Sequence, residues 1–189
     1  AFRFDNRFLA TASVDHTVKV WAVESGEALV TFKGHSRPVN FVRFSPDGAR
    51  LASVSEDRIV KVWEAQTGRE LLTLSPNSAR VTSIAFSSDG KRLSTLSRSD
   101  GVVQIWDAVT GQNLRTIRNT RLFAAHVWSR DGRKLATVDL VDSRRPERKR
   151  IKVWDLTFSQ RQPDEVLLAH SNEVRSVAFC PDNKSFASA

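Results

Sequence analysis

Three residues of the types used in nucleophilic catalysis lie close together in the chain: His35, Ser53 and Asp57. A serine, a histidine and an aspartate can act as nucleophile, general base and orienting carboxylate. The serine of such a site stands exposed beside an oxyanion hole, often on a Gly-x-Ser-x-Gly turn, whereas Ser53 lies in the apolar run Leu-Ala-Ser-Val. The sequence also has no Gly-rich phosphate loop, no zinc-ligand spacing and no catalytic carboxylate pair. We therefore predict that the chain is not an enzyme and uses neither a cofactor nor a metal.

The elements that must position these residues are short strands separated by tight turns. Residues 39–44 lead into Ser-Pro-Asp-Gly, whose proline presets φ and whose glycine tolerates positive φ, so the chain reverses there. Two further turns, at residues 56–58 and 66–68, separate three more strands. The pattern predicts one four-stranded antiparallel unit, with its later strands at residues 50–54, 59–63 and 70–74.

This unit recurs along the chain with a period near 42 residues. A Ser or Thr that follows a hydrophobic-Ala or hydrophobic-Ser pair returns every 42 residues, and a strand-ending Trp returns at spacings of 42, 43 and 48 residues. Four short strands per repeat at this period are typical of propeller blades. The repeated positions are Thr11, Ser53, Thr95 and Thr137, and Trp21, Trp63, Trp106 and Trp154.

On these residues the chain resembles the WD-repeat β-propeller family along essentially its whole length. The resemblance includes Gly34-His35, Asp57 six residues before Trp63, and the pairs Trp106-Asp107 and Trp154-Asp155, in phrases that look like those of bacterial members. It implies an all-β fold, a β-propeller of four-stranded antiparallel blades, here an incomplete arc of about four and a half blades. We expect a single partial propeller over residues 1–189, with blades at about 1–33, 34–74, 75–117 and 118–168 and a half blade at 169–189.

The length of the chain suggests a piece of a longer protein. Seven blades of this period would need about 294 residues, and the chain has 189. It begins inside an apparent first strand, residues 1–4, and ends before the last repeat is complete. We expect such an open arc, isolated, to self-associate through its uncovered blade faces.

Composition favours a cytoplasmic protein. The net charge is +8, no run of apolar residues is long enough to span a membrane, and no signal peptide is visible. The single cysteine, Cys180, cannot form an internal disulfide, which favours a reducing compartment, and we expect it to be buried and inert.

The family resemblance implies a structural role for the residues that resemble a catalytic triad. In that family the His bridges the Asp of the tight turn and the strand Ser or Thr, which in turn reaches the Trp indole nitrogen. The second blade has all four members, His35, Ser53, Asp57 and Trp63. The first and third blades keep Thr11, Asp15 and Trp21, and Thr95, Asp100 and Trp106.

The fourth blade departs most from the pattern. Arg148 stands where an Asp would precede Trp154, and Trp128 replaces the strand-ending Phe. His126 occupies the slot of Val42, Ile84 and Val177, and without a second ligand at metal-binding spacing we expect a partly buried histidine whose polar atoms are satisfied.

A basic loop is expected at residues 143–152, with a net charge of +5. It is either a solvated, mobile loop or a charged site for nucleic acid, an acidic protein segment or anionic lipid. No aromatic residue is interleaved from residue 143 to residue 151, and four of the five Trp residues hold blade-packing positions, which disfavours base stacking. The basic residues of this range are Arg144, Arg145, Arg148, Lys149, Arg150 and Lys152, against the single acid Glu147.

The resemblance implies a non-catalytic scaffold that presents one propeller face to other proteins or peptides, with no small-molecule substrate. Two alternatives stay open: a sensory or substrate-docking domain of a larger bacterial serine/threonine kinase, and a nucleic-acid-associated propeller that uses the basic loop. By position, the family's partner-binding residues correspond to Pro38, Asn40, Glu56, Arg80, Thr82, Ser99, Leu122, Ala124, Glu173 and Arg175.

Overall fold

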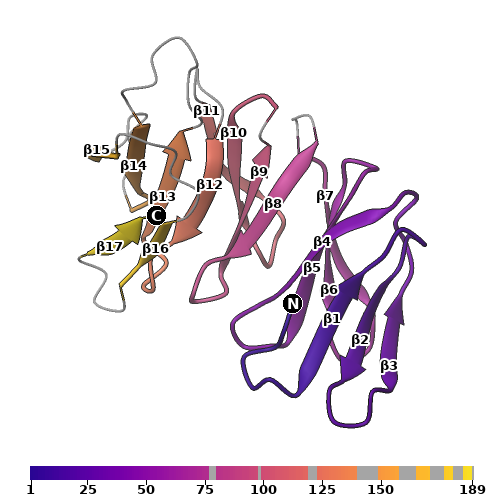
Figure 1. Cartoon of the computed structure of the whole chain (residues 1–189). Helices are drawn as coiled ribbons and strands as arrows, with labels where there is room; N and C mark the ends of the chain where they lie inside the picture. Colours follow the sequence, from indigo (N-terminus) through magenta and orange to yellow (C-terminus); the bar gives the residue numbers. More distant parts are fainter. Residues whose placement is uncertain are drawn as a thin grey trace.

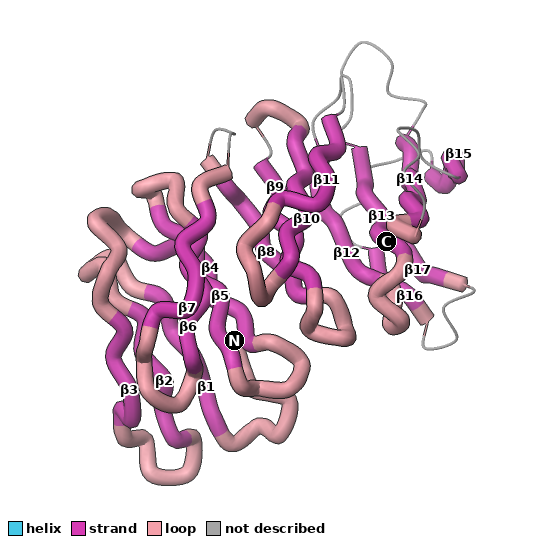
Figure 2. Tube along the Cα trace, turned by 180° about the vertical axis from the view of Figure 1, so that it is seen from behind, coloured by secondary structure: helices cyan, strands magenta, loops and turns pink. Residues whose placement is uncertain are grey.

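The computed structural model describes residues 1–76, 80–97, 99–118, 123–139, 149–157, 165–170, 177–180 and 185–188. Every regular element in these ranges is a β-strand. The strands form five antiparallel sheets that follow one another along the chain. Figures 1 and 2 show the sheets standing side by side in an arc, which runs in Figure 1 from the indigo first sheet to the yellow last one.

The strands of each sheet are consecutive in sequence, as expected for propeller blades. The first sheet contains β1 (Phe8–Ala12), β2 (Val18–Ala22) and β3 (Ala28–Phe32). The second contains β4 (Val39–Phe44), β5 (Arg50–Ser55), β6 (Val60–Glu64) and β7 (Glu70–Leu74). The third contains β8 (Val81–Phe86), β9 (Arg92–Ser97), β10 (Val102–Asp107) and β11 (Asn113–Arg118). The fourth contains β12 (Phe123–Trp128), β13 (Lys134–Asp139), β14 (Lys149–Asp155) and β15 (Glu165–His170), and the fifth β16 (Val177–Phe179) and β17 (Phe186–Ser188).

Side-chain hydrogen bonds explain the sharp turn after the first strand of each complete blade. In the second sheet, Ser45 Oγ donates to Asp47 Oδ1, which also accepts the Ala49 N–H at 3.0 Å. Ser45 Oγ accepts the Arg50 N–H at 2.9 Å, and Gly48 takes the left-handed φ of +71° that the turn requires. Equivalent serine–aspartate pairs close the same turn in the next two sheets, Ser87–Asp89 and Ser129–Asp131.

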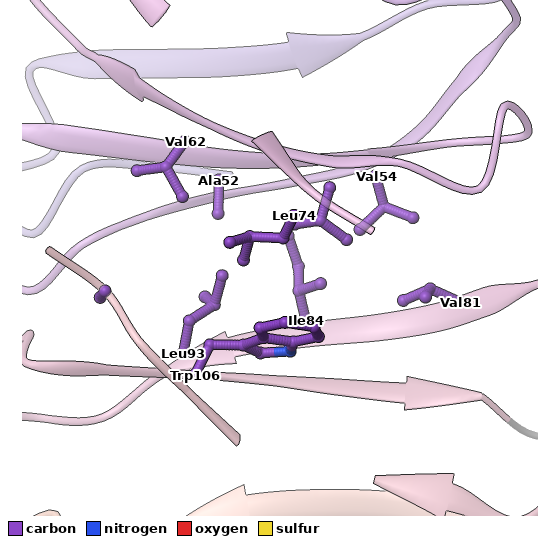
Figure 3. Close-up of a cluster of buried hydrophobic side chains, with 10 residues drawn as sticks. Ala52, Val54, Val62, Leu74, Val81, Ile84, Leu93 and Trp106 are labelled. Atoms are coloured by element: carbon purple, nitrogen blue, oxygen red, sulfur yellow. The ribbon is translucent and has the colours of Figure 1, made fainter. Parts of the chain in front are cut away.

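Apolar side chains between facing sheets form the core. Figure 3 shows Val54 and Leu74 of the second sheet opposite Ile84, Leu93 and Trp106 of the third. Strands β5 and β9 are buried at five of six positions, because a neighbouring sheet covers each of their faces. The fourth strands are less buried, because β7 is buried only at Leu74 and β11 only at Ile117. The core is therefore a series of layers between blades.

The structure corrects the first expected strand. Residues 1–4 do not form one; Phe2 makes a single antiparallel bridge to Leu9. The reason is the turn that follows at once, in which the Asn6 N–H donates to the Arg3 carbonyl at 2.9 Å and Asn6 has a φ of +57°. Only three residues therefore remain to pair with β1.

Three further expectations near the C-terminus also change. Lys149 and Arg150, expected in the basic loop, lie in β14 and pair with β15. Strand β15 extends to His170, two residues past the expected blade boundary, so His170 ends the fourth sheet instead of opening the half blade. Cys180 is half-buried, so the prediction that it is buried is wrong. The ends of β14 and β15 are set by their mutual pairing, which the repeat pattern does not encode.

Candidate protein-interaction face

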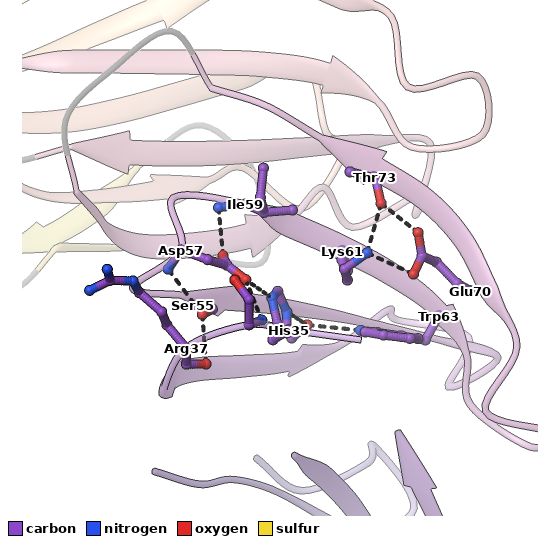
Figure 4. A network of polar contacts seen from close by, with 11 residues as sticks. His35, Arg37, Ser55, Asp57, Ile59, Lys61, Trp63, Glu70 and Thr73 are labelled. Atoms are coloured by element: carbon purple, nitrogen blue, oxygen red, sulfur yellow. Dashed lines mark hydrogen bonds and ion pairs between the residues drawn. The ribbon is translucent and has the colours of Figure 1, made fainter. Parts of the chain in front are cut away.

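The four residues that resemble a catalytic site form one hydrogen-bonded row in the second sheet. His35 Nδ1 lies 2.9 Å from Asp57 Oδ2, and His35 Nε2 lies 2.8 Å from Ser53 Oγ. The Trp63 indole N–H donates to the same Ser53 oxygen at 2.8 Å. Figure 4 shows the row running from the Asp57 turn past His35 to Trp63. Ser53 is fully buried, so its hydroxyl is closed to any substrate.

The row has a single consistent arrangement of protons when His35 is neutral. The Nδ1–H donates to the Asp57 carboxylate, Nε2 accepts the Ser53 hydroxyl, and Ser53 accepts the Trp63 indole N–H. Burial lowers the pKa of His35 below its ordinary value, despite the hydrogen bond and attraction of Asp57. The arrangement therefore matches a structural strut with a neutral histidine.

The carboxylate of Asp57 joins the loop before β4 to the turn after β5. It accepts the Ser36 N–H at 3.1 Å and the Ile59 N–H at 2.9 Å, besides the His35 ring. Burial acts to raise the pKa of Asp57, but these hydrogen bonds outweigh it and leave the pKa below its ordinary value. Ser55 adds a second link, because its hydroxyl donates to the Arg37 carbonyl at 2.9 Å (Figure 4). Both loops are thus held rigidly at this end of the blade.

The serine or threonine to tryptophan hydrogen bond is present in all four larger sheets. The indole N–H to hydroxyl distances are 2.8 Å in the first sheet, 3.1 Å in the third and 2.9 Å in the fourth. In the first sheet, Asp15 accepts hydrogen bonds from Thr17 within its own turn. Asp100 lies in the corresponding turn of the third sheet. The first-sheet pair is Trp21 and Thr11, the third-sheet pair Trp106 and Thr95, and the fourth-sheet pair Trp154 and Thr137.

A second polar cluster, which the sequence did not reveal, links the third and fourth sheets. Ser94 Oγ accepts the Trp128 indole N–H at 2.8 Å and lies 2.9 Å from His126 Nε2. It also donates to the Ala85 carbonyl at 3.1 Å. Among the described residues, His126 Nδ1 is buried without a hydrogen-bond partner, contrary to the expected satisfied histidine. Burial lowers the pKa of His126 to about 4. The sequence contains one sign of this cluster. Ser94 stands where the second blade has Ala52, and its two partners, His126 and Trp128, also depart from the residues of the other repeats.

The residues expected to contact partners include three β-bulge positions. The pairing of each first strand shifts by one residue between Val39 and Phe41, Val81 and Ser83, and Phe123 and Ala125. The skipped residues are Asn40, Thr82 and Ala124, which are 42 residues apart. A bulge leaves its extra residue out of the ladder and redirects the strand locally, and bulges are common beside functional sites. The fold therefore repeats one irregular position on three neighbouring blades.

Four of the expected contact residues lie together across the second and third sheets. Arg80 Nη2 donates to Glu56 Oε1 at 3.1 Å, and the Asn40 amide reaches the same oxygen at 3.5 Å. The Glu56 N–H donates to the Pro38 carbonyl at 2.9 Å. The ion-paired side chains of Arg80 and Glu56 are 60% and 40% exposed, so the pair contributes little to stability. We call Pro38, Asn40, Glu56 and Arg80 the interaction face.

The remaining expected site residues are scattered or outside the described ranges. Thr82 Oγ1 donates to the Leu96 carbonyl at 3.2 Å, and exposed Ser99 lies 3.4 Å from the Ser97 hydroxyl. For Ala124 the structure describes the backbone, within β12. The expectations for Leu122, Glu173, Arg175, Arg144, Arg145 and Arg148 lie outside the described residues.

In the described ranges, no three His, Cys, Asp or Glu side chains gather in a way that could hold a metal ion. The same part of the chain has no helix long and apolar enough to cross a membrane.

Blades of consecutive antiparallel strands, stacked face to face and braced by tryptophan hydrogen bonds, define a β-propeller repeat protein. Residues 1–22, 26–64, 68–107 and 161–189 match the family described as WD domain, G-beta repeat. These ranges make up more than half of the chain, which therefore belongs to the WD-repeat family. Repeats of this family typically mediate protein–protein interactions, and its members are generally non-catalytic.

Similarity to curated proteins extends over single repeats. The chain is 52% identical over 40 residues to the WD40 repeat-containing protein HOS15 of Arabidopsis thaliana, a match that covers 21% of this chain and 6% of that protein. It is 51% identical over 43 residues to the mouse F-box-like/WD repeat-containing protein TBL1X, covering 23% of this chain and 8% of that protein. For human WD repeat-containing protein 37 the identity is 47% over 38 residues, covering 20% and 8%. The chain thus spans under a tenth of the length of these relatives.

Proposed function

We propose that the chain is a non-catalytic scaffold whose interaction face, Pro38, Asn40, Glu56 and Arg80, binds a partner polypeptide, and that residues 1–189 form one partial propeller domain. The observation that carries this proposal is the position of the face on two adjacent blades, with Glu56 next in the chain to Asp57, the residue that begins the hydrogen-bonded row of His35 and Ser53. A surface held rigid before binding loses little conformational entropy when a partner docks.

The polar groups of the face are suited to exchange their contacts for those of a partner. Glu56 and Arg80 are paired with each other at the surface, so a partner can replace this weak pair without leaving a buried charge unpaired. Asn40 offers an amide beside them at the bulge of β4. This set favours a polar, hydrogen-bonding peptide over an apolar one.

Site-specific photo-cross-linking in cells tests the proposal. A photoreactive amino acid at Glu56 or at Arg80 of the full-length protein should label the same polypeptide. The same amino acid at Lys91 or Gln112, exposed positions near the opposite ends of the strands, should not label it. Labelling of the same polypeptide from all four positions, or from the control positions alone, would refute the assigned face.

The two alternatives from the sequence remain predictions with their own tests. The kinase-associated function requires a kinase domain on the same polypeptide, which sequencing of the complete gene would reveal. The nucleic-acid function predicts salt-sensitive binding to DNA or RNA that is lost when Arg144, Arg145, Arg148, Lys149 and Arg150 are replaced by Gln. No binding, or binding that survives the replacement, would exclude it.

A further inference from the structure

A cavity of about 500 Å³ lies between the first and second sheets. Its walls include Phe8 and Leu29 from the first sheet and Phe44, Gly48 and Ala65 from the second. These second-sheet residues lie at the Ser-Pro-Asp-Gly end of the strands, away from the row that includes His35 and Asp57. The cavity is therefore separate from the interaction face.

At the next interface along the arc, between the second and third sheets, an arginine side chain occupies the position that corresponds to the cavity. There the Arg50 guanidinium crosses from the second sheet to the third and donates to the Gly90 carbonyl at 2.6 Å and the Ala108 carbonyl at 2.8 Å. Its carbon lies 5.6 Å from the centre of the Phe86 ring. Two carbonyls and an aromatic ring thus form a receptor for one guanidinium group.

The same two carbonyls and aromatic ring line the cavity, but no arginine donates to them, and the aliphatic stem of Arg3 packs against Gly48 instead. Gly48, Ala65 and Phe44 hold the repeat positions of Gly90, Ala108 and Phe86. Phe8, the first residue of β1, holds the position of Arg50, the first residue of β5. Within the described part of the chain, no hydrogen bond is made to the carbonyl oxygens of Gly48 and Ala65. The replacement of one arginine by phenylalanine has left two acceptors and an aromatic wall facing a cavity.

The charges around the cavity favour a cation. Asp47 and Glu64 line it with carboxylates. Burial acts to raise the pKa of Asp47, but its hydrogen bonds outweigh burial and leave the pKa below its ordinary value, and hydrogen bonds likewise lower the pKa of Glu64. The one lining cation, Arg3, stacks over Phe8 with 3.8 Å between its guanidinium carbon and the ring centre, and its Nε donates to both carboxylate oxygens of Asp5 at 3.1 Å. Arg3 is therefore engaged by Asp5, and Glu64 is engaged by Arg69 at 3.3 Å, which leaves Asp47 as the lining carboxylate that favours a cation.

We propose that this cavity binds the guanidinium group of an arginine side chain from a partner polypeptide. The guanidinium would donate to the carbonyls of Gly48 and Ala65 beside the Phe44 ring, as Arg50 does one blade further on. The exposed Leu29 side chain gives the aliphatic part of the arginine an apolar wall. A polypeptide is the fitting source because the internal precedent is itself an arginine held by its main chain.

Calorimetric titration of the full-length protein with a short peptide tests this proposal. The probe is acetyl-Gly-Ala-Arg-Leu-Ala-amide, which copies the chain around Arg50. Its control replaces arginine by citrulline, which has nearly the same shape without the charge. We expect the arginine peptide to bind at least about tenfold more tightly than the citrulline peptide, because hydrogen bonds from a charged donor are the stronger ones.

Two variants at one position locate the binding. Phe8→Arg should fill the receptor from within and abolish peptide binding, whereas Phe8→Leu, which brings no cation, should retain it. The peptide comparison on the unmodified protein stands even if Phe8→Arg fails to fold. Equal binding of arginine and citrulline peptides, unchanged binding by a folded Phe8→Arg variant, or no binding at millimolar peptide would overturn the proposal. Free N-acetyl-arginine amide binding as tightly as the peptide would also overturn it, because the site would then recognise a small molecule.

Discussion

Acidification should weaken the contact between the third and fourth sheets through His126. The pKa of this buried imidazole is about 4 in the folded chain, against an ordinary value of 6.5. Between these values the unfolded chain binds a proton that the folded chain excludes, so stability is present above pH 6.5 and is lost as the pH falls towards 4. At pH 5 the loss amounts to about 2 kcal/mol, and most of it appears between pH 7 and pH 5.

The variant His126→Val isolates this effect, because valine or isoleucine holds the same position in three other repeats. At pH 7 we expect a change within about 1 kcal/mol, since the lost hydrogen bond to Ser94 is offset by removal of the unpaired buried Nδ1. At pH 5 the variant should be more stable than the original protein by about 1–2 kcal/mol.

Urea denaturation followed by tryptophan fluorescence at pH 7, 6 and 5 measures the effect. The three other histidines are common to both proteins, so their titration cancels in the difference between the two stability curves. Ser94→Ala is a matched control that removes the hydrogen-bond partner but keeps the buried imidazole, and it should retain the pH dependence. Parallel pH profiles for the original protein and His126→Val would refute the reasoning.

Three further substitutions test the contacts within and between blades. Ser53→Ala leaves the Trp63 indole N–H and His35 Nε2 without their partner and should lower the free energy of unfolding by about 2–4 kcal/mol, whereas Ser53→Thr, the residue of the other repeats, should cost under about 1 kcal/mol. Arg50→Met keeps most of the aliphatic stem but loses both inter-blade hydrogen bonds. In urea denaturation it should lower the free energy of unfolding by about 1–3 kcal/mol. The control Arg69→Met, at an exposed position, should lower it by under about 0.5 kcal/mol. Trp128→Phe restores the common residue but removes a donor to Ser94, and thermal unfolding should show a loss of about 1–2 kcal/mol; an unchanged midpoint would mean that the indole N–H is dispensable.

The repeat made the blades predictable from local information. Each turn carries its own hydrogen-bonding residues, as Ser45 and Asp47 do, and each strand its own alternation of side chains. The row from Trp63 to Asp57 could be expected from the family because its members recur at constant spacing. The register shift at Asn40 and its equivalents could not, because a bulge depends on how two strands pair.

The predictions that proved wrong concern segments whose conformation depends on pairing with a neighbouring strand. Residues 1–4 have the composition of a strand, yet the turn at Asn6 limits them to one bridge. Lys149 and Arg150 have the composition of a charged loop, yet pairing with β15 places them in a strand. Local composition describes what a segment tolerates, whereas the hydrogen-bonding partner determines which conformation it adopts.

The amino-acid sequence by itself determined the all-β class, the blade period and the residues that close each turn, because these depend on contacts within one repeat. The tertiary structure decided what lies between repeats. Ser94 meets His126 and Trp128, Arg50 reaches Gly90 and Ala108, and Phe8 leaves a cavity beside Gly48 and Ala65. These outcomes depend on pairs of residues about 30 to 60 positions apart whose proximity follows only from stacking one sheet on the next.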